Sequence, residues 1–105
     1  ANNHSMDQGA AGLLEMLEIA RLAESYGAKV APHCWNSTTV AVAAMAHACA
    51  VMPNALIGEY FPDYEPFCGR FGILEFDLSG GKATVGETPG LGVRMDEDAL
   101  AGHEI

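Results

Sequence analysis

The chain carries Lys29-Val30-Ala31-Pro32-His33-Cys34-Trp35, a short apolar run that a proline ends and that leads directly into a histidine. A second apolar run, Ala55-Leu56-Ile57-Gly58, leads in the same way into Glu59. Helical patterns precede each run, from Ala10 to Tyr26 and from about Thr38 to Val51. Helix, strand, helix and strand in this order predict an α/β protein whose two strands run parallel.

The two predicted helices have recognisable boundaries. The apolar positions of the first one recur at helical spacing, at Leu13, Met16, Leu17 and Ala20. Gly27 stands where a C-cap glycine belongs, and Ser37 is placed to cap the start of the second helix. Pro53-Asn54 then ends that second helix.

The character of the chain changes after Glu59. Residues 60–72 are rich in proline, glycine and aromatics and predict a loop. Residues 73–78 alternate with period two, and Ser79-Gly80-Gly81-Lys82 is expected to turn them back into residues 83–85 as a hairpin. Asp96 is expected to cap a last helical turn over residues 97–101. An antiparallel hairpin after parallel units indicates a tail that packs on another layer or on a second domain.

Composition limits the partners and the compartment. The chain has 14 acidic and 5 basic residues and a formal net charge of -9, which opposes binding to nucleic acid and to anionic membranes. Cys34, Cys49 and Cys68 are widely spaced and form no CxxC pair, so neither a disulfide framework nor a zinc ribbon is predicted. A reducing cytoplasm is the simplest expectation. No apolar run reaches the roughly 18 residues of a membrane span.

Four blocks of the sequence now carry a family resemblance: Gly12-Leu13-Leu14-Glu15-Met16-Leu17-Glu18-Ile19-Ala20, Ala31-Pro32-His33-Cys34-Trp35, Pro53-Asn54-Ala55-Leu56-Ile57-Gly58-Glu59-Tyr60 and Pro89-Gly90-Leu91-Gly92-Val93. In this order and at these gaps they resemble the last part of the enolase superfamily, in its mandelate racemase and muconate lactonizing enzyme-like, acid-sugar dehydratase branch. The resemblance runs from about Asp7 to Ala101. It implies the last strands and helices of a (β/α)8 TIM barrel over residues 1–60, and a C-terminal loop, hairpin and tail that pack on a capping domain over residues 61–105.

The resemblance also implies a chemistry, the removal of a proton α to a carboxylate. His33 resembles the seventh-strand histidine that acts as general base or acid, a task that suits imidazole because it titrates near neutral pH. Glu59 resembles the eighth-strand glutamate, which supports the developing oxyanion. Asp7 resembles the sixth-strand aspartate that orients the histidine, although counting back from Ala11-Gly12 puts Met6 at that position. Cys34 and Trp35 are assigned to packing, with the lining of a pocket as the alternative.

The resemblance further implies Mg²⁺ as cofactor, with ligands on earlier barrel strands that lie before residue 1. A complete barrel takes about 250 residues, so these 105 residues correspond to part of one. We therefore expect the C-terminal segment of a Mg²⁺-dependent racemase or acid-sugar dehydratase that is inactive by itself. Its partners would be the remainder of the barrel, the capping domain and a small carboxylate substrate.

Two other functions stay open. One is a non-catalytic barrel remnant held together by self-association, because its two exposed strand edges invite pairing. The other is a small binding module whose pocket uses His33, Trp35 and Tyr60. Neither the substrate nor the choice between racemisation and dehydration follows from the sequence, and His47 is interpreted as structural.

Overall fold

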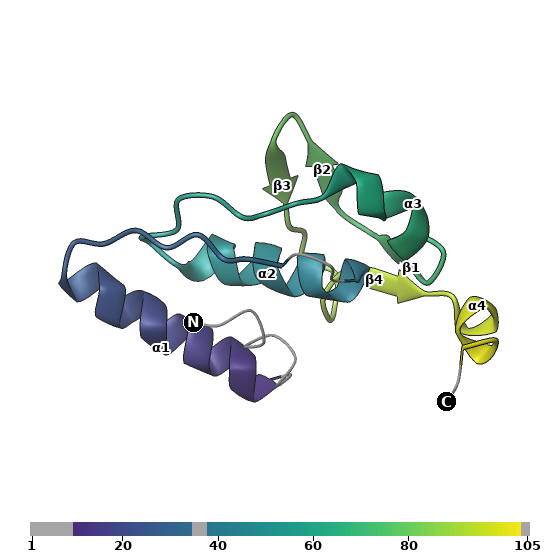
Figure 1. The fold of residues 1–105 in the computed structure, drawn as a ribbon, viewed down its shortest axis with the longest axis horizontal. Helices are drawn as coiled ribbons and strands as arrows, with labels where there is room; N and C mark the ends of the chain where they lie inside the picture. The colour runs from purple at the N-terminus through teal and green to yellow at the C-terminus, as the bar shows by residue number, and fades with distance from the viewer. Residues whose placement is uncertain (1–9, 35–37, 104–105) are drawn as a thin grey trace.

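The molecule is an elongated α/β structure of 46 × 32 × 27 Å in which two helices lie side by side and a strand-rich tail follows (Figure 1). The computed structural model describes residues 10–34 and 38–103. The two helices are α1 (Ala10–Ser25) and α2 (Thr39–Val51). The tail contains the 3-10 turn η2 (Pro62–Tyr64), α3 (Glu65–Cys68), β1 (Gly72–Leu74), β2 (Asp77–Ser79), β3 (Lys82–Thr84), β4 (Val93–Met95) and α4 (Glu97–Ala101).

Helix α1 ends at the glycine that the sequence indicates. Gly27 has a φ of 69°, in the left-handed region that glycine adopts readily. The Gly27 N–H donates to the Glu24 carbonyl at 2.8 Å, and the Ala28 N–H donates to the Ala23 carbonyl at 2.9 Å. These two bonds form a Schellman motif, which satisfies the last carbonyls of the helix. The predicted C-cap is confirmed.

Changing Gly27 to alanine is expected to lower the free energy of unfolding by about 1 kcal/mol, because an L side chain is strained at this φ. Steric contact adds nothing, since no atom lies within 4 Å of the added Cβ. Gly102 provides a matched control: its surroundings are equally open but its φ is -78°. Gly102→Ala should leave stability unchanged or raise it by about 0.5 kcal/mol. Urea unfolding of both variants measures the difference, and equal effects would contradict the prediction.

Helix α2 is apolar on nearly every face, which is typical of a helix buried on more than one side. It packs against α1 on one side and against β1 and β4 on the other. The core between the helices contains Met16 and Ala20 from α1 with Ala48 and Met52 from the end of α2. The N-cap position belongs to Thr38, whose side chain makes no capping hydrogen bond. The assignment of the N-cap to Ser37 is therefore wrong by one residue, and Ser37 itself lies outside the described residues.

The two predicted parallel strands reduce to one bridge, between Val30 and Ala55. The direction of pairing is as predicted, and α2 connects the two segments as a β-α-β crossover. Residues 29–31 and 55–58 do not form full strands, so this expectation is wrong. Pro32 lacks the N–H that would continue the ladder, and within the described part of the chain each segment pairs only with the other.

Asn54 fastens this crossover to α1. Its side chain is 4% exposed, and Nδ2 donates to the carbonyls of Ala20 at 2.9 Å and of Ala28 at 3.0 Å. One buried amide therefore links the C-terminal half of α1, and the residues that lead into the first strand segment, to the start of the second segment.

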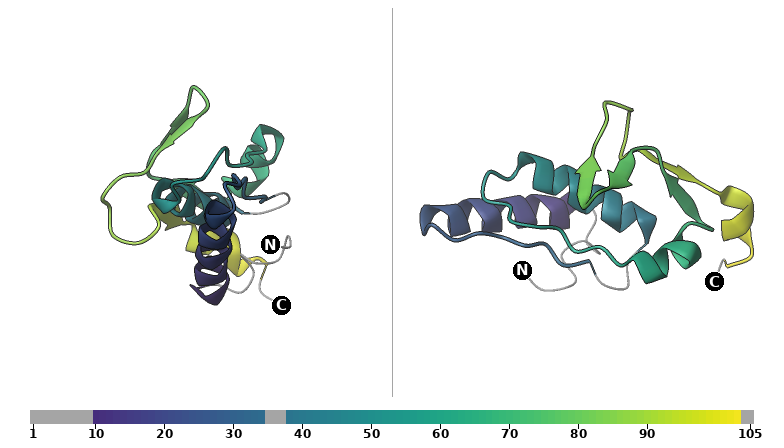
Figure 2. Two further views of the ribbon diagram at one scale, coloured as in Figure 1. Left: turned by 90° about the vertical axis from the view of Figure 1, so that its left-hand side faces the viewer. Right: turned by 90° about the horizontal axis from the view of Figure 1, so that it is seen from above.

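The tail forms two small antiparallel sheets. Strands β2 and β3 make the predicted hairpin, turning through Gly80 and Gly81. Figure 2 shows this hairpin standing out from α2, away from α1. Strand β1 instead pairs with β4, so residues 73–78 are not one strand as expected. A bend between Leu74 and Asp77 directs the two halves to different partners.

The C-terminal helical turn and the surface complete the fold. The Asp96 side chain caps α4 by accepting from the Ala99 N–H at 3.0 Å, as predicted.

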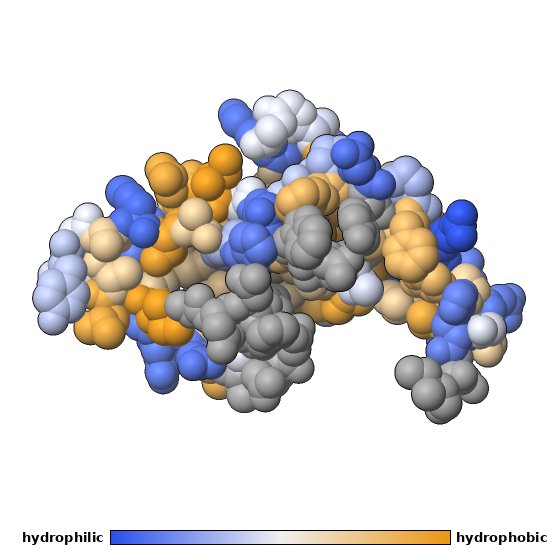
Figure 3. All heavy atoms as spheres, viewed as in Figure 1, coloured by the Kyte–Doolittle hydropathy of each residue, from blue (hydrophilic) through white to orange (hydrophobic). Residues whose placement is uncertain are grey.

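Figure 3 shows hydrophobic surface on the left-hand side of the molecule, where α1 ends. Large apolar side chains exposed in the structure include Leu14, Leu22, Val51, Leu56 and Ile57. Among the described residues, no helix combines the length and hydropathy needed to cross a bilayer.

Candidate active site

His33 and Glu59 meet where the two parallel segments end. The His33 Nε2 and Glu59 Oε2 atoms are 3.3 Å apart. The side chains are 46% and 29% exposed, so solvent or a substrate can reach both groups. Two of the three residues predicted for the site are thus in contact. Asp7, the third, lies outside the described residues, as does Trp35.

The contact depends on a slip in the parallel ladder. The Val30 N–H donates to the Asn54 carbonyl at 3.0 Å and the Leu56 N–H donates to the Val30 carbonyl at 2.8 Å, which is regular parallel pairing. Two residues further on, a regular ladder would have the Gly58 N–H donate to the Pro32 carbonyl. The Glu59 N–H does so instead, at 3.2 Å. An extra residue of this kind reverses the face on which the following side chain lies.

Close packing between the second segment and α2 favours glycine at position 58. A Cβ at this position would lie 3.0 Å from the Met45 Cε and 3.1 Å from the Met45 Sδ in α2. The absence of a side chain therefore lets the second segment approach α2 closely just before Glu59.

Cys34 makes two hydrogen bonds to Glu59. Its backbone N–H donates to the Glu59 Oε2 at 3.1 Å, and its Sγ donates to the Glu59 carbonyl at 2.9 Å. Burial, followed by the nearby Glu59 carboxylate and the Cys49 thiol, raises the pKa of the Cys34 thiol from 9.0 to about 11. The thiol therefore keeps its proton at neutral pH, which makes it a hydrogen-bond donor and a poor nucleophile.

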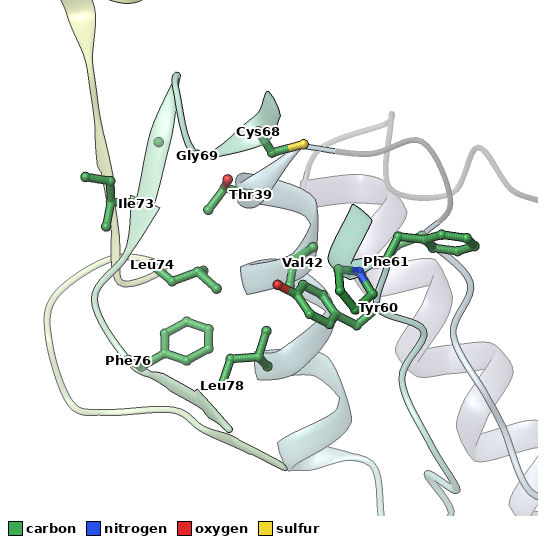
Figure 4. Close-up of a pocket in the computed structure, with 13 residues that line it drawn as sticks. Thr39, Val42, Tyr60, Phe61, Cys68, Gly69, Ile73, Leu74, Phe76 and Leu78 are labelled. Atoms are coloured by element: carbon green, nitrogen blue, oxygen red, sulfur yellow. The ribbon is translucent and has the colours of Figure 1, made fainter. Parts of the chain in front are cut away.

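A cavity of about 600 Å³ opens beside Cys34, between α2 and the tail (Figure 4). Figure 4 shows Leu74, Phe76 and Leu78 on the tail side, with Val42 and Tyr60 opposite. Its wall is mostly apolar, formed by Cys34, Thr39, Val42, Tyr60, Phe61, Pro62, Cys68, Gly69, Gly72, Ile73, Leu74, Phe76 and Leu78. Of the pocket predicted from His33, Trp35 and Tyr60, Tyr60 lines this cavity and His33 does not, while Trp35 lies outside the described residues. The sequence did not assign the tail residues Leu74, Phe76 and Leu78 to a pocket, because they meet there across the bend between β1 and β2.

His47 has a structural position, as interpreted from the sequence. Its Nε2 lies 3.2 Å from the Leu91 carbonyl, and its ring meets that of Phe76 edge-on with centroids 6.2 Å apart. The histidine thus connects α2 to the tail.

The described residues do not fit a metal site. Nowhere in residues 10–34 and 38–103 do three or more His, Cys, Asp or Glu side chains gather closely enough to hold an ion. Such a site needs several oxygen or nitrogen ligands around one point. His33 and Glu59 form only a pair.

Comparison with known proteins assigns the fold and the family. The family model described as Enolase C-terminal domain-like matches residues 6–99. A solved enolase from the environmental genome shotgun sequencing of the Sargasso Sea is 40% identical, with a TM-score of 0.82 over 92% of this chain and 26% of its own. An enolase of the mandelate racemase subgroup from Agrobacterium tumefaciens has a TM-score of 0.74 at 28% identity, over 88% of this chain and 25% of its own.

Curated relatives give the same picture. A D-galactarolactone cycloisomerase from Agrobacterium fabrum is 31% identical over 101 residues, which cover 88% of this chain and 26% of the relative. A D-galactonate dehydratase family member from Streptomyces bingchenggensis is 37% identical over 93 residues, covering 88% and 22%. The chain spans about a quarter of the length of these relatives. The resemblance inferred from the four sequence blocks is confirmed, and the chain belongs to the enolase C-terminal domain-like family.

Proposed function

We propose that this chain supplies the proton-transfer pair of an enolase-superfamily enzyme that removes the proton α to a carboxylate, as a racemase or acid-sugar dehydratase. The contact between His33 Nε2 and Glu59 Oε2 at the ends of adjacent parallel segments supports it most directly. Catalytic groups of (β/α)8 barrels lie at the C-terminal ends of the strands, because the loops there surround the substrate.

His33 would act as the general base. Its imidazole is partly exposed and presents Nε2 toward the pair, where a neutral ring nitrogen can accept a proton from carbon and later return it. Glu59 would lie beside the substrate carboxylate and hydrogen-bond the oxygen on which negative charge develops. In the free chain the two side chains contact each other, so a substrate would have to enter between them or displace one.

The remainder of the active site would come from residues other than those described. The relatives are about four times as long as this chain, which leaves room for the earlier barrel strands and a capping domain. Family membership implies Mg²⁺, and the described residues offer no cluster to ligate it, so we assign its ligands to that remainder. In the same proposal, residues 1–60 belong to the barrel and residues 61–105 form the tail that packs on the capping domain. The chain alone would then be inactive.

The relatives support a proposal for the substrate class. Those named above are a cycloisomerase of D-galactarolactone and a member of the D-galactonate dehydratase family. We therefore propose an aldonate, an aldarate or an aldarolactone as substrate.

A hybrid enzyme tests this function. The matching quarter of the Sargasso Sea enolase would be replaced by this chain, since the two superpose with a TM-score of 0.82. With Mg²⁺ and a panel of sugar acids in D₂O, proton NMR should show loss of an α-proton signal or formation of a dehydrated product. A folded hybrid that leaves every substrate unchanged, while the parent enzyme reacts, would contradict the proposal.

A further inference from the structure

We propose that Cys34 is a positioning residue that holds Glu59 against His33. The role assigned to the pair rests on the proposed function, but the positioning itself is a property of this chain. The need for positioning arises at Pro32. This residue has no N–H to donate, so the pairing of the two segments is incomplete beyond Val30 and Ala55.

Beyond this point, two hydrogen bonds from Cys34 and one to Pro32 hold Glu59 in place of regular strand pairing. The Glu59 N–H reaches the Pro32 carbonyl, the Glu59 carbonyl accepts from the Cys34 thiol at 2.9 Å, and the carboxylate accepts from the Cys34 N–H at 3.1 Å. Cys34 thus contacts both the main chain and the side chain of Glu59, in addition to the main-chain bond from Glu59 to Pro32. Without these bonds the Glu59 side chain would be free to turn away from His33.

The environment of Cys34 suits this role. The residue is only 8% exposed, so its hydrogen bonds face little competition from water. A protonated thiol is required for the bond to the Glu59 carbonyl, and burial keeps it protonated. Cys34 also lines the cavity beside α2. It therefore connects the proton-transfer pair to the packing between α2 and the tail.

Amide hydrogen exchange at residue 34 tests the positioning directly. Cys34→Ala keeps the backbone N–H but removes the thiol bond, and its protection factor at residue 34 should fall about five- to tenfold, the loss expected for one hydrogen bond. Cys34→Ser retains a donor and should restore most of the protection. Cys49→Ala, which removes a neighbouring, partly buried thiol, should lower the protection at residue 34 clearly less than Cys34→Ala does.

The amides of Ala44 and Ala46 in the buried face of α2 act as the internal reference. A fall at residue 34 that the reference amides do not share supports positioning. No fall in Cys34→Ala, or an equal fall at residue 34 and in α2, would overturn the inference, since the latter marks general destabilisation.

Kinetics of the hybrid enzyme add a second readout. Cys34→Ala should lower kcat at least threefold with KM nearly unchanged, and Cys34→Ser should recover the rate, because a misplaced Glu59 affects the transition state more than binding. An unchanged kcat in Cys34→Ala would overturn the inference. If the unsubstituted hybrid catalyses nothing, the proposed function fails, while the exchange data still decide whether Cys34 positions Glu59.

Discussion

Replacing His33 with asparagine should lower the rate of α-proton exchange in the hybrid enzyme by about 10²- to 10⁴-fold, the usual contribution of a positioned acid–base group. Asparagine approximates the size and polarity of the imidazole but has no nitrogen that accepts a proton at neutral pH. The loss should fall on kcat and leave KM little changed, since the substitution removes a group needed in the transition state.

His103→Asn is the matched control for this experiment. His103 contacts Phe71 in the tail, with ring centroids 5.1 Å apart, and does not belong to the proposed site. The same change of residue type there should leave exchange within about twofold of the unsubstituted hybrid. Exchange that survives in His33→Asn at a similar level would remove His33 as the base. Deuterium incorporation followed by proton NMR gives both rates.

The largest effect on stability is expected at Asn54. Asn54→Asp should lower the free energy of unfolding by about 3–5 kcal/mol at neutral pH, the range for a buried charge without a compensating partner. The side chain is 4% exposed and Nδ2 faces two carbonyl oxygens, those of Ala20 and Ala28. A carboxylate oxygen in that place would repel both carbonyls. The other carboxylate oxygen would take the place of the Asn54 Oδ1, which has no hydrogen-bond partner among the described residues. It would therefore gain no hydrogen bond to offset the buried charge.

Urea unfolding of the chain at two pH values measures this effect. The deficit should shrink at low pH, where a protonated aspartic acid can again donate to one carbonyl. Asn54→Ala should cost less, about 2 kcal/mol, because it loses two bonds without burying a charge. Leu22→Ala, at an exposed position of α1, should change stability by less than about 0.5 kcal/mol. An Asn54→Asp variant as stable as Leu22→Ala would contradict the assigned role of the amide.

Local signals in the sequence predicted much of the fold. Gly27 and Asp96 end and begin their helices through bonds among near neighbours, so their roles follow from spacing alone. The partner of β1 did not follow, because β4 lies some twenty residues further along and pairing at that distance leaves no local pattern. The bend that separates β1 from β2 interrupts a run whose alternation looks continuous.

The candidate site was likewise predicted only in part from the sequence. The apolar runs ending in His33 and Glu59 placed both residues at segment ends, and the structure brings them within 3.3 Å. The sequence did not predict the hydrogen bonds between Cys34 and Glu59, because they arise from a slip in the ladder that only the three-dimensional pairing reveals. Pro32 gave a hint, since a proline inside a strand pattern often marks a place where regular pairing ends.

The slipped ladder has a consequence for how such an enzyme changes over evolutionary time. His33 and Glu59 are fixed relative to each other by main-chain bonds from Pro32 and Cys34, within one β-α-β unit. Under the proposed function, the segments that recognise the rest of the substrate lie elsewhere and can vary without disturbing this pair. The unit would then be an interchangeable module, able to serve different sugar acids while its own geometry stays constant.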